Sequence, residues 1–135
     1  KRKGRLKVHR LDHLVLTVKD PETTSRFYER VLGMEARVMA NGRMALHFGN
    51  QKLNLHEVGS DVEPRATAPS VGSGDLCFVI DSPISDALGE LQELDIPLVA
   101  GPVERTGALG AMQSLYFYDP DGNLIEVSAY EDGAQ

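Results

Sequence analysis

The chain has 135 residues, of which 41% are hydrophobic and 25% charged, and its formal net charge is -6 at pH 7. This length favours one compact domain, and the composition excludes a disordered chain. No apolar run approaches membrane-spanning length, so no membrane partner is expected. The clustered basic residues all lie in the tail at residues 1–10, and without a basic face over the fold no nucleic-acid partner is expected either.

Cys77 is the only cysteine of the chain, so no internal disulfide can form. A reducing compartment is the simpler inference, and we predict a cytoplasmic protein. The basic tail has no apolar segment after its charges and does not resemble a secretory signal. Cys77 itself is expected to be a small buried apolar residue.

The first predicted elements are a strand and a helix. Apolar residues alternate over residues 13–18, which predicts a strand. Asp20 and Pro21 then provide an N-cap and a first helical residue, and Gly33 suits a left-handed C-terminal cap. A helix over residues 21–32 follows from these signals and from an apolar stripe at a spacing of four.

Three strands are predicted next, over residues 36–39, 44–48 and 53–58. They are separated by the turn pairs Asn41-Gly42 and Gly49-Asn50. Residues 60–73 are rich in Gly, Pro, Ser and Ala, which indicates a linker.

The strand and helix then recur. From His13/Asp75 to Met34/Ile96 the two copies keep a constant offset of 62 residues. Ser82-Pro83 is predicted to cap the second helix, which should stop before Pro97. The offset later becomes 69, and the extra residues, 105–110, predict a mobile loop over a site. A last hairpin, 115–118 and 124–128, turns on residues 119–123.

The repeat predicts an α+β fold of two tandem βαβββ modules in a single domain over residues 11–130. The modules span about residues 11–59 and 74–130. Their small sheets are expected to form one curved mixed sheet around a trough, with the helices outside.

Strand alternation decides which side chains face this trough. If the Leu, Ile and Val residues cover the helices, four polar residues from four strands face inward: His13, His56, Asp75 and Glu126. On the fourth strand the alternation favours His56, whereas the repeat offset pairs Glu126 with Glu57, which stays the alternative.

Each of these residues also has a structural interpretation. An ionised Glu126 among apolar strand residues needs a cation, either a metal ion or Arg105 in an ion pair. Asp75 could bind a metal directly, bind it through water, or cap backbone groups at a strand start. His47 alternates in step with the residues that face the trough. We expect it at the surface or beside the ligands rather than as a ligand itself.

The chain resembles the vicinal oxygen chelate superfamily of glyoxalases, bleomycin and fosfomycin resistance proteins and extradiol dioxygenases. The resemblance covers residues 11–130 and depends on the repeated helix start and on Tyr118-Asp119-Pro120-Asp121-Gly122-Asn123 followed by Leu124-Ile125-Glu126. Residues 54–59, 75–78 and 101–107 resemble the glyoxalase-domain-containing protein 5 type within that superfamily.

This resemblance implies a divalent metal, Zn, Ni, Co, Mn or Fe(II), at His13, His56, Asp75 and Glu126. Relatives with established activities usually carry His where this chain has Asp75. A lyase or isomerase of the lactoylglutathione lyase type is implied, with Glu126 as the catalytic residue, a small substrate that chelates the metal through vicinal oxygens, and glutathione as a possible co-substrate. A homodimer is also implied, and whether the site closes within one chain or between two stays open.

Two alternative functions are an Fe(II) extradiol-type dioxygenase and a non-catalytic binding or resistance protein of the bleomycin-resistance kind. Thiol transfer to an epoxide, as in fosfomycin resistance, lacks an anion-binding cluster in the sequence.

Overall fold

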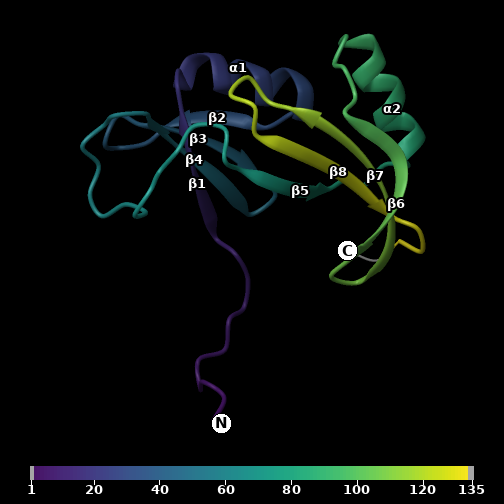
Figure 1. Ribbon diagram of the computed structural model, residues 1–135, viewed down its shortest axis with the longest axis horizontal. Helices are drawn as coiled ribbons and strands as arrows, with labels where there is room; N and C mark the ends of the chain where they lie inside the picture. Colours follow the sequence, from purple (N-terminus) through teal and green to yellow (C-terminus); the bar gives the residue numbers. More distant parts are fainter. Residues whose placement is uncertain (1, 134–135) are drawn as a thin grey trace.

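Two modules of the same topology, each a strand, a helix and three further strands, make up the structure (Figure 1). It is a computed structural model that describes residues 2–133. The elements of the first module are β1 (His13–Val18), α1 (Pro21–Leu32), β2 (Glu35–Val38), β3 (Met44–Phe48) and β4 (Gln51–Glu57). Those of the second are β5 (Asp75–Val79), α2 (Ile84–Glu93), β6 (Ala100–Gly107), β7 (Gly110–Tyr118) and β8 (Leu124–Tyr130).

Each module forms a four-stranded sheet, with strand orders β1-β4-β3-β2 and β5-β8-β7-β6. The first and last strands of each module are therefore parallel neighbours, and the other pairings are antiparallel. Helix α1 packs on β3 and α2 on β7, and both helices lie on the same side of the curved sheet (Figure 1). The predicted α+β fold of two tandem βαβββ modules is confirmed. We call the sheet surface turned away from the helices the inner face.

Helix α1 begins and ends where the sequence predicts. The Asp20 carboxylate accepts a hydrogen bond of 3.1 Å from the backbone N–H of Glu22, and Pro21 is the first helical residue. Gly33 follows the helix with φ 65°. Glycine adopts this left-handed conformation at little energetic cost because it has no Cβ.

Helix α2 starts differently from the prediction. Its N-cap position is Pro83, and no side chain, that of Ser82 included, makes a capping hydrogen bond there. The helix is held instead by its apolar face, on which Leu91 is 3% exposed. It ends at Glu93, with Leu94 as the C-cap residue, ahead of Pro97 as expected.

The helix-facing side chains of both modules belong to one hydrophobic core. Aromatic pairs connect the modules: the Phe27 and Phe117 ring centroids are 6.2 Å apart, and those of Phe48 and Phe78 are 5.3 Å apart and edge-to-face. The modules are thus held together on their helix side, which leaves the inner face open for binding.

Residues 119–123 form a turn built around one buried carboxylate. Asp119, which is 5% exposed, accepts hydrogen bonds from the backbone N–H groups of Asp121 and Asn123 and from the Asn123 side-chain amide. The Tyr28 hydroxyl of α1 donates a fourth, at 2.7 Å. Burial and the neighbouring carboxylate raise the pKa of Tyr28, so it stays a neutral donor. The turn therefore also fastens the second module to the first helix.

The predicted mobile loop at residues 105–110 is wrong. These residues extend the β6–β7 hairpin, in which Thr106 pairs with Ala111 and Gly107 with Gly110. Gly107 lies close against β8, where a Cβ would be 2.5 Å from the Tyr130 hydroxyl oxygen. The Tyr130 hydroxyl also accepts a hydrogen bond from the backbone N–H of Leu109.

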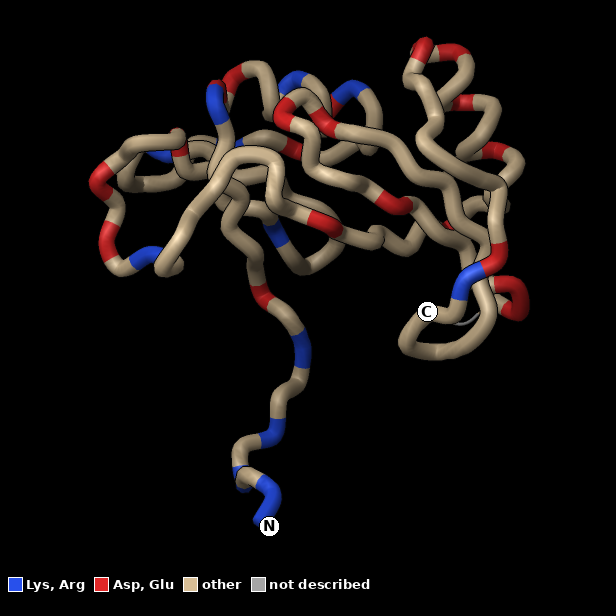
Figure 2. The backbone as a smooth tube through the Cα atoms, in the orientation of Figure 1, with Lys and Arg blue, Asp and Glu red and all other residues tan. Residues whose placement is uncertain are grey.

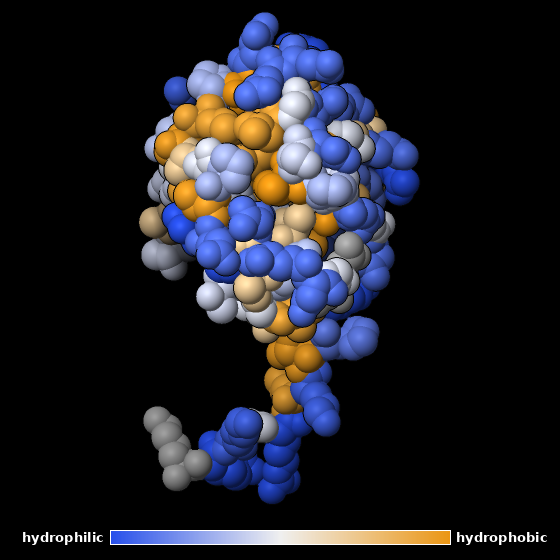
Figure 3. All heavy atoms as spheres, turned by 90° about the vertical axis from the view of Figure 1, so that its right-hand side faces the viewer, coloured by the Kyte–Doolittle hydropathy of each residue, from blue (hydrophilic) through white to orange (hydrophobic). Residues whose placement is uncertain are grey.

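The basic N-terminal tail runs away from the sheets as an extended segment (Figure 1). Its Leu6 and Val8 are 95% and 88% exposed, and apolar atoms are visible where the tail leaves the body (Figure 3). Neither helix within residues 2–133 has the length and hydropathy needed to span a membrane.

Candidate functional site

The inner face carries the polar side chains that strand alternation predicts. On β1 and β4 the buried residues Leu16, Val18, Leu53 and Leu55 face the helix. His13 and His56 alternate with them and therefore lie on the inner face. On β8, Ile125 and Val127 are buried toward the helix, so Glu126 also faces inward. The predicted orientation of these strands is confirmed.

The strand register separates His13 from His56. His13 pairs with Lys52, Val15 with Asn54, and Thr17 with His56. Since a strand rises about 3.3 Å per residue, the two histidine positions lie about 13 Å apart along the neighbouring strands. One metal ion cannot bind both imidazoles of the same chain.

The register of the second module identifies the counterpart of Glu126. Cys77 pairs with Glu126 there, and the repeat offset makes Cys77 the equivalent of Val15, which pairs with Asn54. Asn54, which the sequence interpretation missed, is thus equivalent to Glu126. The alternative Glu57 pairs with Val18 and has the parity of the helix side.

Asn54 has an unsatisfied polar atom. Its side-chain Oδ1 is buried and has no hydrogen-bond partner among the described residues. A buried carbonyl oxygen without a donor is uncommon in folded proteins and calls for a ligand, an ion or a water molecule. Asn54 is one row further along the sheet than His13 and on the adjacent strand, so both can reach one ligand.

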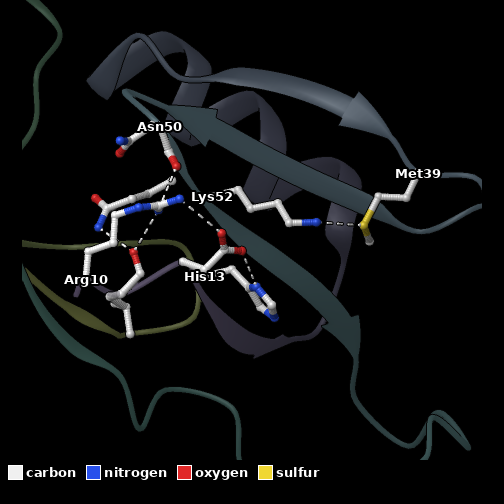
Figure 4. Close-up of polar contacts among 8 residues, drawn as sticks. Arg10, His13, Met39, Asn50 and Lys52 are labelled. Carbon is white, nitrogen blue, oxygen red and sulfur yellow. Dashed lines mark hydrogen bonds and ion pairs between the residues drawn. The ribbon is translucent and has the colours of Figure 1, made fainter. Parts of the chain in front are cut away.

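His13 is held by a carboxylate (Figure 4). Its Nδ1 is 2.8 Å from Asp12 Oδ2, and Asp12 also lies 3.6 Å from the Arg10 guanidinium. The hydrogen bond with His13 lowers the pKa of Asp12, so Asp12 is a carboxylate that accepts the Nδ1 proton. With Nδ1 donating to Asp12, a neutral His13 ring presents its Nε2 lone pair to a ligand, which is the arrangement found in many metal-binding histidines.

Glu126 has no cationic partner within the described part of the chain. The ion pair with Arg105 does not form, because the Arg105 Nε donates to the Tyr116 hydroxyl at 2.9 Å and the guanidinium lies over the Tyr116 ring. Ser128 donates a hydrogen bond of 3.1 Å to Glu126 Oε2, and Ser114 lies 2.6 Å from Ser128. Two hydroxyls thus orient a half-buried carboxylate.

Cys77 lies directly beside Glu126, and because much of it is exposed, the buried position expected from the sequence is wrong. Its Sγ is 3.2 Å from the Ser128 hydroxyl, and burial raises its pKa, with the Glu126 charge acting in the same direction. Cys77 is therefore a neutral thiol near neutral pH and a poor nucleophile.

Three pockets adjoin these residues, and one of them, of about 350 Å³, is lined by both His56 and Asp75. His13, Asp75 and Cys77 line a second pocket of about 370 Å³ together with Lys52. His56 also lines the third, of about 320 Å³, under the linker beside Arg65. Burial, then the Arg43 charge, lowers the pKa of His56, so its imidazole favours the neutral form.

The inner-face donors form two pairs with the same geometry. His13 and Asn54 are diagonal neighbours on β1 and β4, and Asp75 and Glu126 are diagonal neighbours on β5 and β8. Within residues 2–133 of one chain, no three His, Cys, Asp or Glu side chains lie close enough together to hold a metal. Nitrogen and oxygen donors of this kind suit a divalent cation, and each pair offers two such donors.

Comparisons of the sequence with a family model and with known proteins agree on one superfamily. The sequence model of the Glyoxalase/Bleomycin resistance protein/Dioxygenase superfamily matches residues 10–127. Virulence protein STM3117 of Salmonella typhimurium is 54% identical over 91% of this chain and 85% of that protein. Glyoxalase domain-containing protein RDO1 of Mycosarcoma maydis is 54% identical over 94% of this chain and 72% of that protein.

Solved structures have the same fold. An integron cassette protein of V. cholerae superposes with a TM-score of 0.92 at 54% identity, covering 95% of this chain and all of that one. Lactoylglutathione lyase of Agrobacterium tumefaciens is more distant, with a TM-score of 0.69 at 25% identity over 89% of this chain and 92% of that one. TnmS3, an antibiotic binding protein of Streptomyces, shares the fold at 19% identity and a TM-score of 0.72 over 94% of this chain and 100% of that one.

Proposed function

The chain belongs to the Glyoxalase/Bleomycin resistance protein/Dioxygenase superfamily, and from this we propose that it is a metal-dependent lyase or isomerase of the glyoxalase type. Its substrate is a small molecule that presents two neighbouring oxygens. The observation that carries the proposal is the carboxylate of Glu126, which faces the open sheet surface with hydroxyl partners and no cation within the described residues. An ionised carboxylate in that position is stabilised by a bound cation.

We infer that His13 and Asn54 supply one half of the metal site and that Asp75 and Glu126 supply the other. The donor set fits a divalent ion, because the Asn54 Oδ1 lacks a partner and Asp12 orients the His13 ring. When bound, such an ion acts as a Lewis acid that stabilises negative charge on a substrate oxygen.

The proton transfer is assigned to Glu126. Its carboxylate takes the proton from the carbon that bears the substrate hydroxyl and returns it to the neighbouring carbonyl carbon, while the hydroxyl proton passes from the first oxygen to the second, so that hydroxyl and carbonyl exchange places. Ser128, backed by Ser114, holds one carboxylate oxygen and leaves the other free. The raised pKa of Cys77 keeps that thiol protonated and out of the reaction.

We propose that a second copy of the chain completes the site. The two donor pairs are equivalent by the internal repeat, so a symmetric dimer can join the first module of each copy to the second module of the other. Charge disfavours contact between two second modules: residues 74–130 carry 1 Lys or Arg and 10 Asp or Glu, whereas residues 11–59 carry 6 and 6 (Figure 2). The second module of one copy meets less repulsion against the balanced first module of the other than against a second acidic module.

Two histidine variants separate this donor set from one that includes His56. His13→Gln should weaken zinc binding by about a hundredfold, because it removes a ligand that a carboxylate orients. His56 lies some four residues further along the sheet than His13. His56→Gln should therefore leave the zinc affinity within about threefold of wild type. Competition titration with a coloured zinc chelator measures both. Equal losses in the two variants would contradict the proposed ligands.

Turnover distinguishes the functional classes. The glutathione hemithioacetal of methylglyoxal, tested with zinc, nickel, cobalt, manganese and ferrous forms, should give a lactoyl thioester if the substrate resembles that of lactoylglutathione lyase. The extradiol alternative is disfavoured because the register prevents His13 and His56 of one chain from forming a two-histidine iron site. A protein that binds no metal, and whose melting temperature a chelator leaves unchanged, would favour a binding function instead.

A further inference from the structure

Lys52 carries a half-buried positive charge whose side-chain partner is a thioether. Its Nζ lies 3.4 Å from the sulfur of Met39, a weak hydrogen-bond acceptor (Figure 4). No carboxylate of the described residues lies within ion-pair distance of Lys52. The nearby Asp12 is engaged by His13 and Arg10. A partly desolvated ammonium in this position is stabilised by an anion.

The strand pairings surround Lys52 with other basic side chains. Lys52 pairs with His13 on one side and with His47 of β3 on the other, so the three side chains form one row of the inner face. The next row includes Arg37 of β2, opposite Ala45. At the β2 end of these rows lies one acidic residue, Glu35, which pairs with His47 and already forms an ion pair with Arg37.

This cluster is not visible in the sequence, because its members are scattered over residues 13–52. The sequence alone shows no anion-binding cluster, and the strand pairings are what bring Lys52, His13 and His47 together in the folded chain. Lys52 also lines the pocket of about 370 Å³ that includes His13 and Asp75. Lys52 thus lines the same hollow as two of the proposed metal ligands.

We propose that Lys52 is the anion-binding residue of the substrate site, so that the natural substrate carries a carboxylate, phosphonate or phosphate group besides its two chelating oxygens. This inference rests on the proposed function in one respect: the chelating oxygens are placed at the proposed metal ligands. Because Lys52 and His13 are on adjacent strands, about 4.8 Å apart, the anionic group and the chelating oxygens fit one small molecule.

The test uses metal-free protein, prepared with a chelator that is then removed, and two probes, malonate and inorganic phosphate. Their dissociation constants are measured by NMR titration at low ionic strength, where screening is weak. Lys52→Gln should weaken the binding of a recognised probe about tenfold, since it removes a charged hydrogen-bond donor. Lys52→Arg, which keeps the charge, should recover most of the affinity.

The matched control is Lys19→Gln, which removes the same charge from the exposed position after β1. It should change probe binding less than about twofold. Malonate and phosphate distinguish a carboxylate from a phosphoryl substrate by which of them depends on Lys52. Failure of both probes to bind the wild type, or equal losses in Lys52→Gln and Lys19→Gln, would overturn the proposal.

A zinc titration of the same proteins separates this inference from the proposed function. Lys52-dependent anion binding in a protein that takes up no zinc would support the anion site and contradict the metal-dependent function. Zinc binding at the proposed ligands together with anion binding indifferent to Lys52 would overturn the anion site alone.

Discussion

Glu126→Gln should abolish turnover and weaken zinc binding by about a hundredfold or more, because the amide keeps the shape of the side chain and loses its charge and its basicity. Ser128 can still donate a hydrogen bond to the Gln carbonyl oxygen, so the fold should be preserved. Zinc affinity and the rate with the hemithioacetal are the two readouts. A free energy of unfolding close to that of the wild type would show that the losses of zinc affinity and rate arise in the site.

Glu57→Gln is the matched control for this variant. Glu57 ends β4, has the parity of the helix side, and was the alternative ligand suggested by the repeat offset. Its substitution should leave zinc affinity and rate within about twofold of wild type, as expected for an exposed carboxylate away from the site. Loss of zinc in Glu57→Gln and retention in Glu126→Gln would reverse the assignment.

Asp119→Ala should lower the free energy of unfolding by about 3–4 kcal/mol, because it leaves buried donors of both modules without an acceptor. Those donors are the Tyr28 hydroxyl, the backbone N–H groups of Asp121 and Asn123, and the Asn123 amide. Urea denaturation measures the change.

Asp121→Ala provides the comparison within the same turn. The Asp121 side chain accepts only long contacts of 3.4 Å from the backbone of Lys19, and a loss below about 1 kcal/mol is expected. A small loss for Asp119→Ala, comparable to that of Asp121→Ala, would mean that the buried carboxylate does not hold the modules together.

Local signals in the sequence are sufficient to predict where α1 begins and ends and which face of a strand each side chain occupies. Asp20, Pro21 and Gly33 placed both ends of α1 because caps act within one turn of the helix. Alternation placed His13, His56 and Glu126 on the inner face because the period of a strand is two residues. Neither inference needs information from distant parts of the chain.

The register between strands could not be obtained in this way. The shared letters of Asn54-Leu55 and Asn123-Leu124 suggested an offset of 69, whereas the pairing of β1 with β4 and of β5 with β8 makes Asn54 the counterpart of Glu126. Parallel pairing depends on how the intervening hairpins close, and one changed turn shifts every later position. Lys52 was missed for the same reason, since its neighbours His13 and His47 meet it only across strands.

Zinc content of mixed dimers tests most directly whether two copies share each site. His13→Gln chains and Glu126→Gln chains, carrying different tags and purified as mixed dimers, bring one unmodified first module together with one unmodified second module. About one zinc per mixed dimer is expected, while each variant alone binds almost none. Mixed dimers that bind no zinc, or a wild-type protein that binds zinc as a monomer, would contradict a site shared between copies.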